Sequence, residues 1–196
     1  MPPPSPTPAN HPDGCVFGFN AAIDRRSIEA LVNAVGVARG WGFDTVTIAF
    51  SSIGGDVEHA FYALNVLMGL PVKIVMHNVG TVASCAAIVF MAGDERRAVP
   101  GASFFFHPAV PGLSGDRLTA KVMRNRASAA QLIDARTAKA LAVRTGQEEE
   151  VVKKWIANEQ TIGADQAQSL GIVKFVTPLT LGPKVFFEQL LVIETR

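Results

Sequence analysis

The sequence is poor in cysteine, in surplus charge and in long apolar stretches, and each shortage excludes a class of protein. Its only cysteines are Cys15 and Cys85, which form no disulfide framework and no Cys/His metal-binding spacing. Lysine and arginine number 18 against 17 acidic residues, which argues against a nucleic-acid partner. No apolar run approaches the roughly 18 residues that span a bilayer, and the first residues lack the regions of a secretory signal. We therefore expect a cytoplasmic protein without a membrane segment, a metal or a cofactor of its own.

The remaining patterns divide the chain into a tail, one globular domain and a second tail. Residues 1–14 are rich in proline and small polar residues, a composition that predicts disorder. Residues 15–177 alternate apolar, β-branched runs with segments whose apolar residues recur at helical spacing. This alternation predicts an α/β domain with a mostly parallel sheet covered by helices. Residues 178–196 form an apolar tail whose shape the pattern leaves open.

One stretch, residues 115–145, has no proline and no internal glycine, and it predicts a single long helix closed by Gly146. At about 1.5 Å per residue such a helix is roughly 45 Å long, more than one face of so small a domain can cover. The excess should project and pack against another copy of the chain. The apolar residues expected to serve this packing are Leu118, Val122, Met123, Leu132, Ile133 and Leu141.

Ser84 stands between an apolar run that reads as a strand, residues 71–76, and a second run that reads as a helix, residues 86–92. Free backbone N–H groups and the positive end of the helix dipole would favour an oxyanion beside this hydroxyl. An isolated serine here would be read as an ordinary helix N-cap. It becomes a nucleophile only where a base takes its proton and donors await the oxyanion.

The sequence offers candidates for both requirements. His107 follows a short strand and precedes a proline, which favours an extended backbone and makes it the candidate base. His77, near the end of the strand before Ser84, is the alternative base. Cys85 could be a thiol nucleophile, although a small apolar residue that contributes its backbone N–H is the simpler interpretation. The glycine turn at residues 54–55 could supply a second backbone N–H donor.

Several motifs, in order along the chain, carry a resemblance to a known family. They are residues 51–57 (SSIGGDV), 82–87 (VASCAA) and 105–108 (FFHP), followed by 141–148 (LAVRTGQE) with 164–173 (ADQAQSLGIV). Each motif alone is weak, but together they resemble the Clp-type proteolytic subunit, the caseinolytic serine peptidase family, over about residues 15–177. The resemblance implies an α/β fold of the crotonase-like ββα-superhelix type and a serine endopeptidase that uses a Ser-His-acid triad.

The resemblance also assigns roles to individual residues. Ser84 takes the position of the nucleophile and His107 that of the general base, while the N–H groups of Gly55 and Cys85 form the oxyanion hole. Counting back from residues 171–173, the family's triad aspartate falls on Glu159, which is one methylene longer.

Two further expectations concern the acid. Asn158 could orient the histidine ring in place of Glu159, or the triad could be incomplete. In the resembled family, ring contacts order the segment that carries the acid.

The resemblance implies partners as well. It suggests a homo-oligomer of seven-membered rings stacked in pairs through the helix at 115–145, which cleaves peptides or unfolded segments inside a chamber. A Clp-type ATPase would be the family's partner. Here, however, only about 14 residues precede the first strand, and Thr47 and Ala49 stand where the family has exposed tyrosines. These departures argue against ATPase coupling more than against hydrolysis.

Two other functions remain open at this point. A catalytically inactive shell or binding subunit with the same fold would explain the glutamate at position 159. A crotonase-like acyl-CoA enzyme would share the glycine-rich oxyanion turn, but it needs no Ser-His pair.

Overall fold

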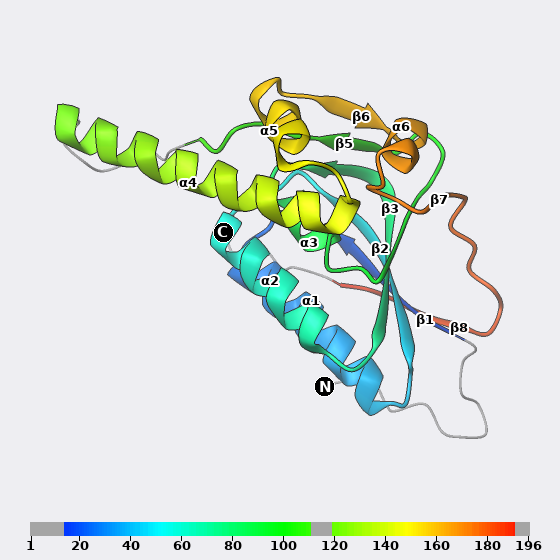
Figure 1. Ribbon diagram of the computed structural model, residues 1–196. Coiled ribbons are helices and arrows are strands. Elements are labelled where there is room, and N and C mark those ends of the chain that lie inside the picture. Colours follow the sequence, from blue (N-terminus) through cyan, green and yellow to red (C-terminus); the bar gives the residue numbers. More distant parts are fainter. Residues whose placement is uncertain (1–13, 111–118, 191–196) are drawn as a thin grey trace.

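The computed structural model describes residues 14–110 and 119–190, which form a mixed α/β structure (Figure 1). Its first half contains β1 (Gly14–Asn20), α1 (Arg25–Gly40), β2 (Thr45–Ser52), α2 (Val57–Gly69), β3 (Lys73–Ala83) and α3 (Ala86–Phe90). The middle contains β4 (Glu95–Ala98), β5 (Ser103–Phe105), α4 (Ala120–Thr145) and α5 (Glu149–Ala157). The last part contains β6 (Thr161–Gly163), α6 (Ala164–Ser169), β7 (Phe175–Val176) and β8 (Val185–Gln189).

The strands belong to one sheet with the order β6-β5-β3-β2-β1-β8, and β4 and β7 extend it beside β3. The neighbours β1, β2 and β3 are parallel, as the alternation of strands and helices predicts. One edge of β3 pairs first with β4 and then, over its last three residues, with β5. Because Ser52 pairs with Val82 and Ala83 with Phe105, the carboxyl ends of β2, β3 and β5 lie side by side.

Aromatic rings fill much of the core between the sheet and the helices α1, α2 and α3, which pack against one another (Figure 1). Phe19 of β1 stacks on Phe50 of β2 with ring centroids 5.0 Å apart. Phe90 of α3 meets Phe104 of β5 at 5.3 Å. Each such buried side chain contributes about 2 kcal/mol to folding, so these contacts fix the strands that lead to the candidate site.

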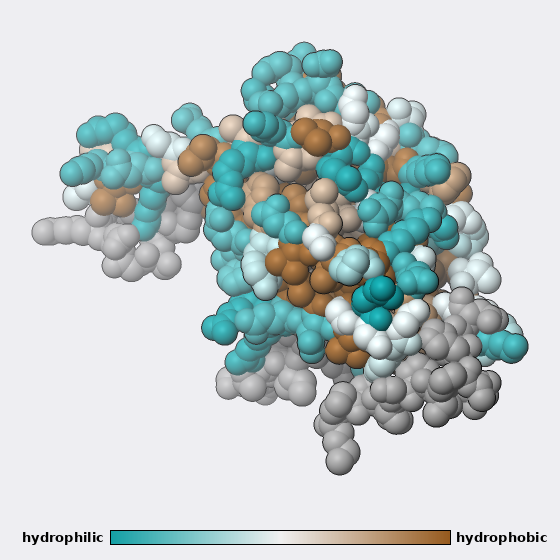
Figure 2. Space-filling view, turned by 60° about the horizontal axis from the view of Figure 1, so that its bottom comes forward, coloured by the Kyte–Doolittle hydropathy of each residue, from teal (hydrophilic) through white to brown (hydrophobic). Residues whose placement is uncertain are grey.

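The long helix α4 projects from the body, as expected from its length (Figure 1). Its buried residues, Ala138, Leu141, Ala142 and Thr145, all lie toward its C-terminal end. The projecting part, at the left of Figure 2, is mostly hydrophilic with a few hydrophobic residues among the polar ones. Leu141 therefore belongs to the core rather than to a surface for a second copy, whereas Met123 and Leu132 are exposed.

The helix also begins later than the sequence indicated. Thr119 has an extended backbone and its hydroxyl accepts a hydrogen bond from the Val122 N–H, so it is the N-cap of a helix that starts at Ala120. The absence of proline and glycine permits a helix without fixing where it starts. Residues 115–118, with Leu118, lie outside the described residues.

The segment after residue 177 is part of the sheet. Its strand β8 pairs in parallel with β1, and Phe186 packs its ring against Phe17 and Trp41. The boundary drawn at residue 177 therefore separates two strands of one sheet. Residues 1–13 lie outside the described residues, and Gly14 already belongs to β1. Within residues 14–110 and 119–190, the helices include none both long and apolar enough to cross a bilayer.

Candidate active site

Ser84 occupies a sharp turn between β3, which ends at Ala83, and α3, which begins at Ala86. Its φ angle is +56°, in the left-handed region that residues with a Cβ rarely adopt. The turn is fixed from the side of β5, because the Ser84 N–H donates a hydrogen bond of 2.8 Å to the Phe105 carbonyl. A strained backbone held in place by its neighbours is typical of a functional position.

A glycine turn fits against Ser84 from the side of β2. Gly54 has a φ of +94°, and a Cβ there would lie 2.7 Å from the Ser84 Cβ. Gly55 has a φ of +152°, and a Cβ there would collide with the Ile23 carbonyl oxygen. Ile23 holds the turn through two hydrogen bonds, from its N–H to the Gly54 carbonyl at 2.9 Å and from the Asp56 N–H to its own carbonyl at 2.7 Å. The turn thus needs two glycines.

The two residues expected to supply the oxyanion donors, Gly55 and Cys85, line the same pocket. Among the described residues, neither the Gly55 nor the Cys85 N–H joins a backbone–backbone hydrogen bond. Burial raises the pKa of the Cys85 thiol to about 11, while hydrogen bonds of the Gly55 and Cys85 backbones oppose that rise. Both backbones therefore reach the region of the Cys85 sulfur. A thiol with so high a pKa stays protonated near neutral pH, which favours a backbone role for Cys85 over a thiolate nucleophile.

His107 lies beside Ser84 because of the sheet register. Phe105 pairs with Ala83 at the end of β3, and the chain then reaches His107 two residues later. The ring stacks on Phe105 with centroids 5.5 Å apart, and its Nδ1 lies 2.7 Å from the Pro108 carbonyl oxygen. In a neutral ring whose Nδ1–H donates to that carbonyl, Nε2 carries the lone pair and can accept a proton.

The rival base, His77, lies elsewhere. It is buried in the middle of β3, and its Nε2 lies 3.0 Å from the Thr177 carbonyl oxygen. Burial, the largest cause, lowers the pKa of His77, and the nearby charge of Arg97 lowers it further. His77 is absent from the described lining of the pocket that contains Ser84, so His107 is the better candidate.

Glu159 belongs to a segment that bonds to the segment of His107. In the antiparallel pair β5–β6, Phe105 faces Thr161, and the Phe106 N–H donates to the Gln160 carbonyl. Glu159 and His107 are the next residues beyond this hydrogen bond on the two segments. The Glu159 side chain is exposed and does not line the pocket. Within residues 14–110 and 119–190, no hydrogen bond joins Glu159 to His107, or His107 to Ser84.

Glu159 is also conformationally unusual. Its φ of +50° places it, with Ser84, as one of two non-glycine residues with positive φ in the described chain. It follows the C-cap of α5, with its N–H bonded to the Ile156 carbonyl and the Gln160 N–H bonded to the Trp155 carbonyl. This is the Schellman arrangement, in which the position of Glu159 is usually glycine. Asn158, the other candidate to orient the ring, is the exposed C-cap before it.

A pocket of about 210 Å³ unites most of these groups. It contains Gly55, Ser84, Cys85 and His107 of the expected site. Its other wall was not expected from the sequence and comes from three residues of α4, Ile133, Asp134 and Thr137, together with Ile156 of α5. Their spacing along α4, three and four residues, was the available signal, because such residues share one face of a helix.

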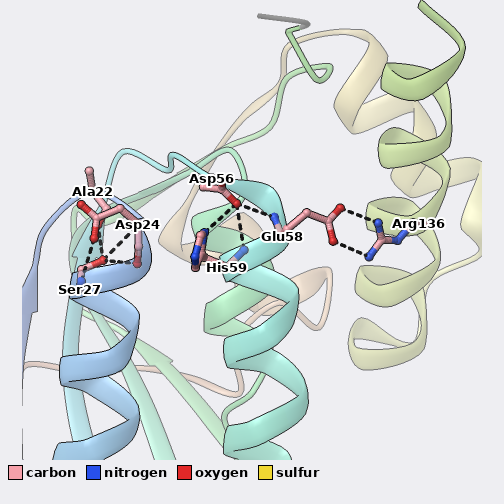
Figure 3. A network of polar contacts seen from close by, with 7 residues as sticks. All are labelled: Ala22, Asp24, Ser27, Asp56, Glu58, His59 and Arg136. Atoms are coloured by element: carbon pink, nitrogen blue, oxygen red, sulfur yellow. Dashed lines mark hydrogen bonds and ion pairs between the residues drawn. The ribbon is translucent and has the colours of Figure 1, made fainter. Parts of the chain in front are cut away.

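A polar network links the glycine turn to this second wall (Figure 3). Asp56, which follows Gly55, caps α2 by accepting hydrogen bonds from the N–H groups of Glu58 and His59 at 2.9 and 3.0 Å. The Glu58 carboxylate lies 2.7 Å from the Arg136 guanidinium of α4. Arg136 also lies over the Phe61 ring, 4.3 Å from its centroid. The network therefore joins α2 to the part of α4 that lines the pocket.

Comparisons with known proteins bear on the family and the fold. The family model described as Clp protease matches residues 42–178. The ATP-dependent Clp protease proteolytic subunit 2 of Pseudomonas aeruginosa is 22% identical over 153 residues, which cover 77% of this chain and 75% of that protein. The subunit of the same name from Borreliella burgdorferi is 31% identical over 72 residues, 36% of each chain. The structure of a ClpP1 mutant from Listeria monocytogenes superposes with a TM-score of 0.73 at 19% identity, and covers 82% of this chain and 90% of its own.

Proposed function

Because the chain belongs to the Clp protease family, we propose that it is a serine endopeptidase with Ser84 as the nucleophile and His107 as the general base. One observation carries this proposal. Ser84 is held in a left-handed turn between the glycine turn and β5, in a pocket that it shares with His107. A serine N-cap of a helix needs neither the strained backbone nor the histidine.

The proposed reaction follows from the placement of these groups. The His107 Nε2 takes the proton of the Ser84 hydroxyl while Oγ attacks the peptide carbonyl carbon, and the N–H groups of Gly55 and Cys85 stabilise the oxyanion. His107 then gives the proton to the leaving amine, so that the C–N bond breaks and an acyl ester remains on Ser84. Water, deprotonated by His107, hydrolyses the ester. These steps require no metal and no organic cofactor.

We propose Glu159 as the acid that orients His107. Its neighbour Gln160 accepts a hydrogen bond from the Phe106 N–H, next to His107, and position 159 keeps a glutamate where glycine would relieve about 1 kcal/mol of strain. To act, its carboxylate must replace the Pro108 carbonyl as the partner of Nδ1. A carboxylate there would also stabilise the imidazolium that forms during the reaction.

The proposal extends to the assembly. We propose that copies of the chain form seven-membered rings stacked in pairs, enclosing a chamber for peptides, with the exposed Met123 and Leu132 of α4 at the contact between rings. Such a protein would work in the cytoplasm, and a Clp-type ATPase need not take part. The finer description of the fold, a crotonase-like ββα superhelix, belongs to the same proposal.

An inactive shell is the second candidate, and one observation favours it. In the described chain, no hydrogen bond joins Ser84, His107 and Glu159 to one another, and Glu159 is absent from the lining of the pocket that Ser84 and His107 share. Contacts in a ring could complete the triad, since catalytic hydrogen bonds often tighten only in the working complex.

The test is labelling with a fluorophosphonate, followed by intact mass and peptide mapping. We expect one adduct on Ser84 in the assembled protein and none in Ser84→Ala, with peptide hydrolysis at least about 1000-fold lower in Ser84→Ala and His107→Ala. Glu159→Gln should lose less activity than His107→Ala. Ser169→Ala, which removes an exposed hydroxyl of α6, is the matched control and should behave as the wild type. Assembled protein without an adduct would establish the inactive shell instead.

A further inference from the structure

The α4 wall of the pocket carries a carboxylate that the proposed reaction does not use. Asp134 lies on the same helix face as Thr137, three residues later, and next to Ile133. Among the described lining residues, Asp134 alone has an acidic side chain. One of its oxygens, Oδ1, accepts a hydrogen bond of 2.8 Å from the Ala109 N–H, two residues after His107. The carboxylate is thus anchored beside the catalytic segment, and within residues 14–110 and 119–190 no hydrogen bond uses Oδ2.

Two described cations of α4 and α5, Arg136 and Lys153, are already paired with other acids. Arg136, two residues along α4, contacts Glu58. Lys153 of α5 lies 3.0 and 2.7 Å from Glu149 and Glu150. In the described part of the chain, no ion pair involves Asp134, although its side chain is only partly exposed. A partly buried carboxylate without a cation gains most from a ligand that brings one.

The rest of the pocket suits a long side chain with a charged end. Its other walls are largely apolar and include Val57, Phe106, Val110 and Ile156. Apolar walls can cover the methylene stem of a lysine or arginine, whose charged end then reaches a carboxylate. The arrangement lies next to Ser84, where a substrate side chain beside the cleaved bond must sit.

We infer that Asp134 is a specificity-determining residue, which selects peptides with arginine or lysine at the residue whose carbonyl carbon Ser84 attacks. This inference rests on the proposed peptidase function. Arginine should be favoured over lysine, because its planar guanidinium can bond a carboxylate through two parallel N–H groups.

The test compares three fluorogenic peptides that differ only in having arginine, citrulline or leucine at that residue. Citrulline keeps the shape of arginine without its charge. A charge-assisted hydrogen bond predicts that the wild type cleaves the arginine peptide with a kcat/KM about 10- to 100-fold above that of the citrulline peptide. In Asp134→Asn, which keeps an oxygen for the Ala109 N–H, the ratio of kcat/KM on the arginine peptide to that on the citrulline peptide should fall to about one.

The control variant is Asp44→Asn, which removes a carboxylate that is 90% exposed and should retain the preference. Equal rates on the arginine and citrulline peptides in the wild type would overturn the inference. So would an equal loss on all three peptides in Asp134→Asn, since that indicates a structural role in bracing Ala109. In both cases, labelling of Ser84 and cleavage of the leucine peptide would leave the peptidase function standing. Failure to label Ser84 or to cleave any peptide would overturn both.

Discussion

The two halves of the candidate site are held in different ways. The nucleophile half, with Ser84 and Gly55, is fixed by backbone contacts from β2, β5 and the Ile23 segment. The acid half depends on side chains, because Glu159 is exposed and the His107 ring bonds the carbonyl of its own neighbour, Pro108.

This difference indicates which part of the site a single copy of the chain can form by itself. An oxyanion hole built from backbone N–H groups needs only a correct turn, and the fold supplies that turn. A triad needs side chains aligned over hydrogen-bond distances, and rigid surroundings must hold them. The nucleophile half should therefore be insensitive to assembly, whereas the acid half should respond to it.

The largest effect should come from breaking the nucleophile half at Gly55. In Gly55→Ala the new Cβ meets the Ile23 carbonyl at a φ that alanine avoids, so we expect the free energy of unfolding to fall by about 3 kcal/mol. Urea unfolding measures this change, and peptide hydrolysis should disappear with it.

Gly36→Ala is the matched control. Gly36 lies within α1 with no atom within 4 Å of a Cβ, so its replacement should stabilise the protein by about 0.5–1 kcal/mol. If Gly55→Ala were as harmless as Gly36→Ala, the glycine turn would not be rigid, and the contrast between the two halves would fail.

A smaller effect should come from the two strained residues, one in each half. Ser84→Gly and Glu159→Gly each remove a Cβ from a left-handed backbone, so each should stabilise the protein by about 1 kcal/mol. Thermal unfolding measures the gain. Both variants should lose activity, because each gives up a side chain that the proposed mechanism uses.

Asn158→Gly is the control for Glu159→Gly. Asn158 has a φ of −93°, so its backbone carries no left-handed strain that glycine could remove. We expect no stabilisation from this change. A stabilised Glu159→Gly that keeps full activity would remove Glu159 from the triad and leave the strain at residue 159 without a function.

The same contrast explains what could be predicted from the sequence. Ser84, His107 and Gly55 come together as expected, because residues that follow parallel strands meet at one edge of the sheet. The family resemblance is confirmed, and so is the α/β fold. The strand β8 was not predicted, because its pairing with β1 depends on contacts between distant parts of the chain.

The α4 wall was missed for a related reason. A helix that carries apolar residues around much of its circumference does not reveal which face meets the body. Ile133 was therefore assigned to a contact between copies, although it lines the pocket, and Asp134 was not singled out at all.

The smallest effect should come from Asp56, which follows the glycine turn and caps α2. Hydrogen bonds from the His59 backbone, the largest cause, together with the His59 side chain and the Glu58 N–H, lower the pKa of Asp56 below its usual 3.8, and burial opposes them only in part. A lowered pKa in the folded state stabilises it at pH above the unfolded value, and this contribution disappears as the pH falls through the folded value. Asp56→Ala should thus cost about 0.5 kcal/mol at about pH 7, because the side chain is half exposed, and much less at about pH 2.5. Urea unfolding at both pH values measures the difference.

The control is Thr119→Ala, which removes a cap that does not titrate, so its cost in unfolding free energy should be the same at both pH values. A cost of Asp56→Ala that did not change with pH would mean that an uncharged carboxyl oxygen caps α2 as well as the carboxylate does, so that the charge of Asp56 contributes nothing.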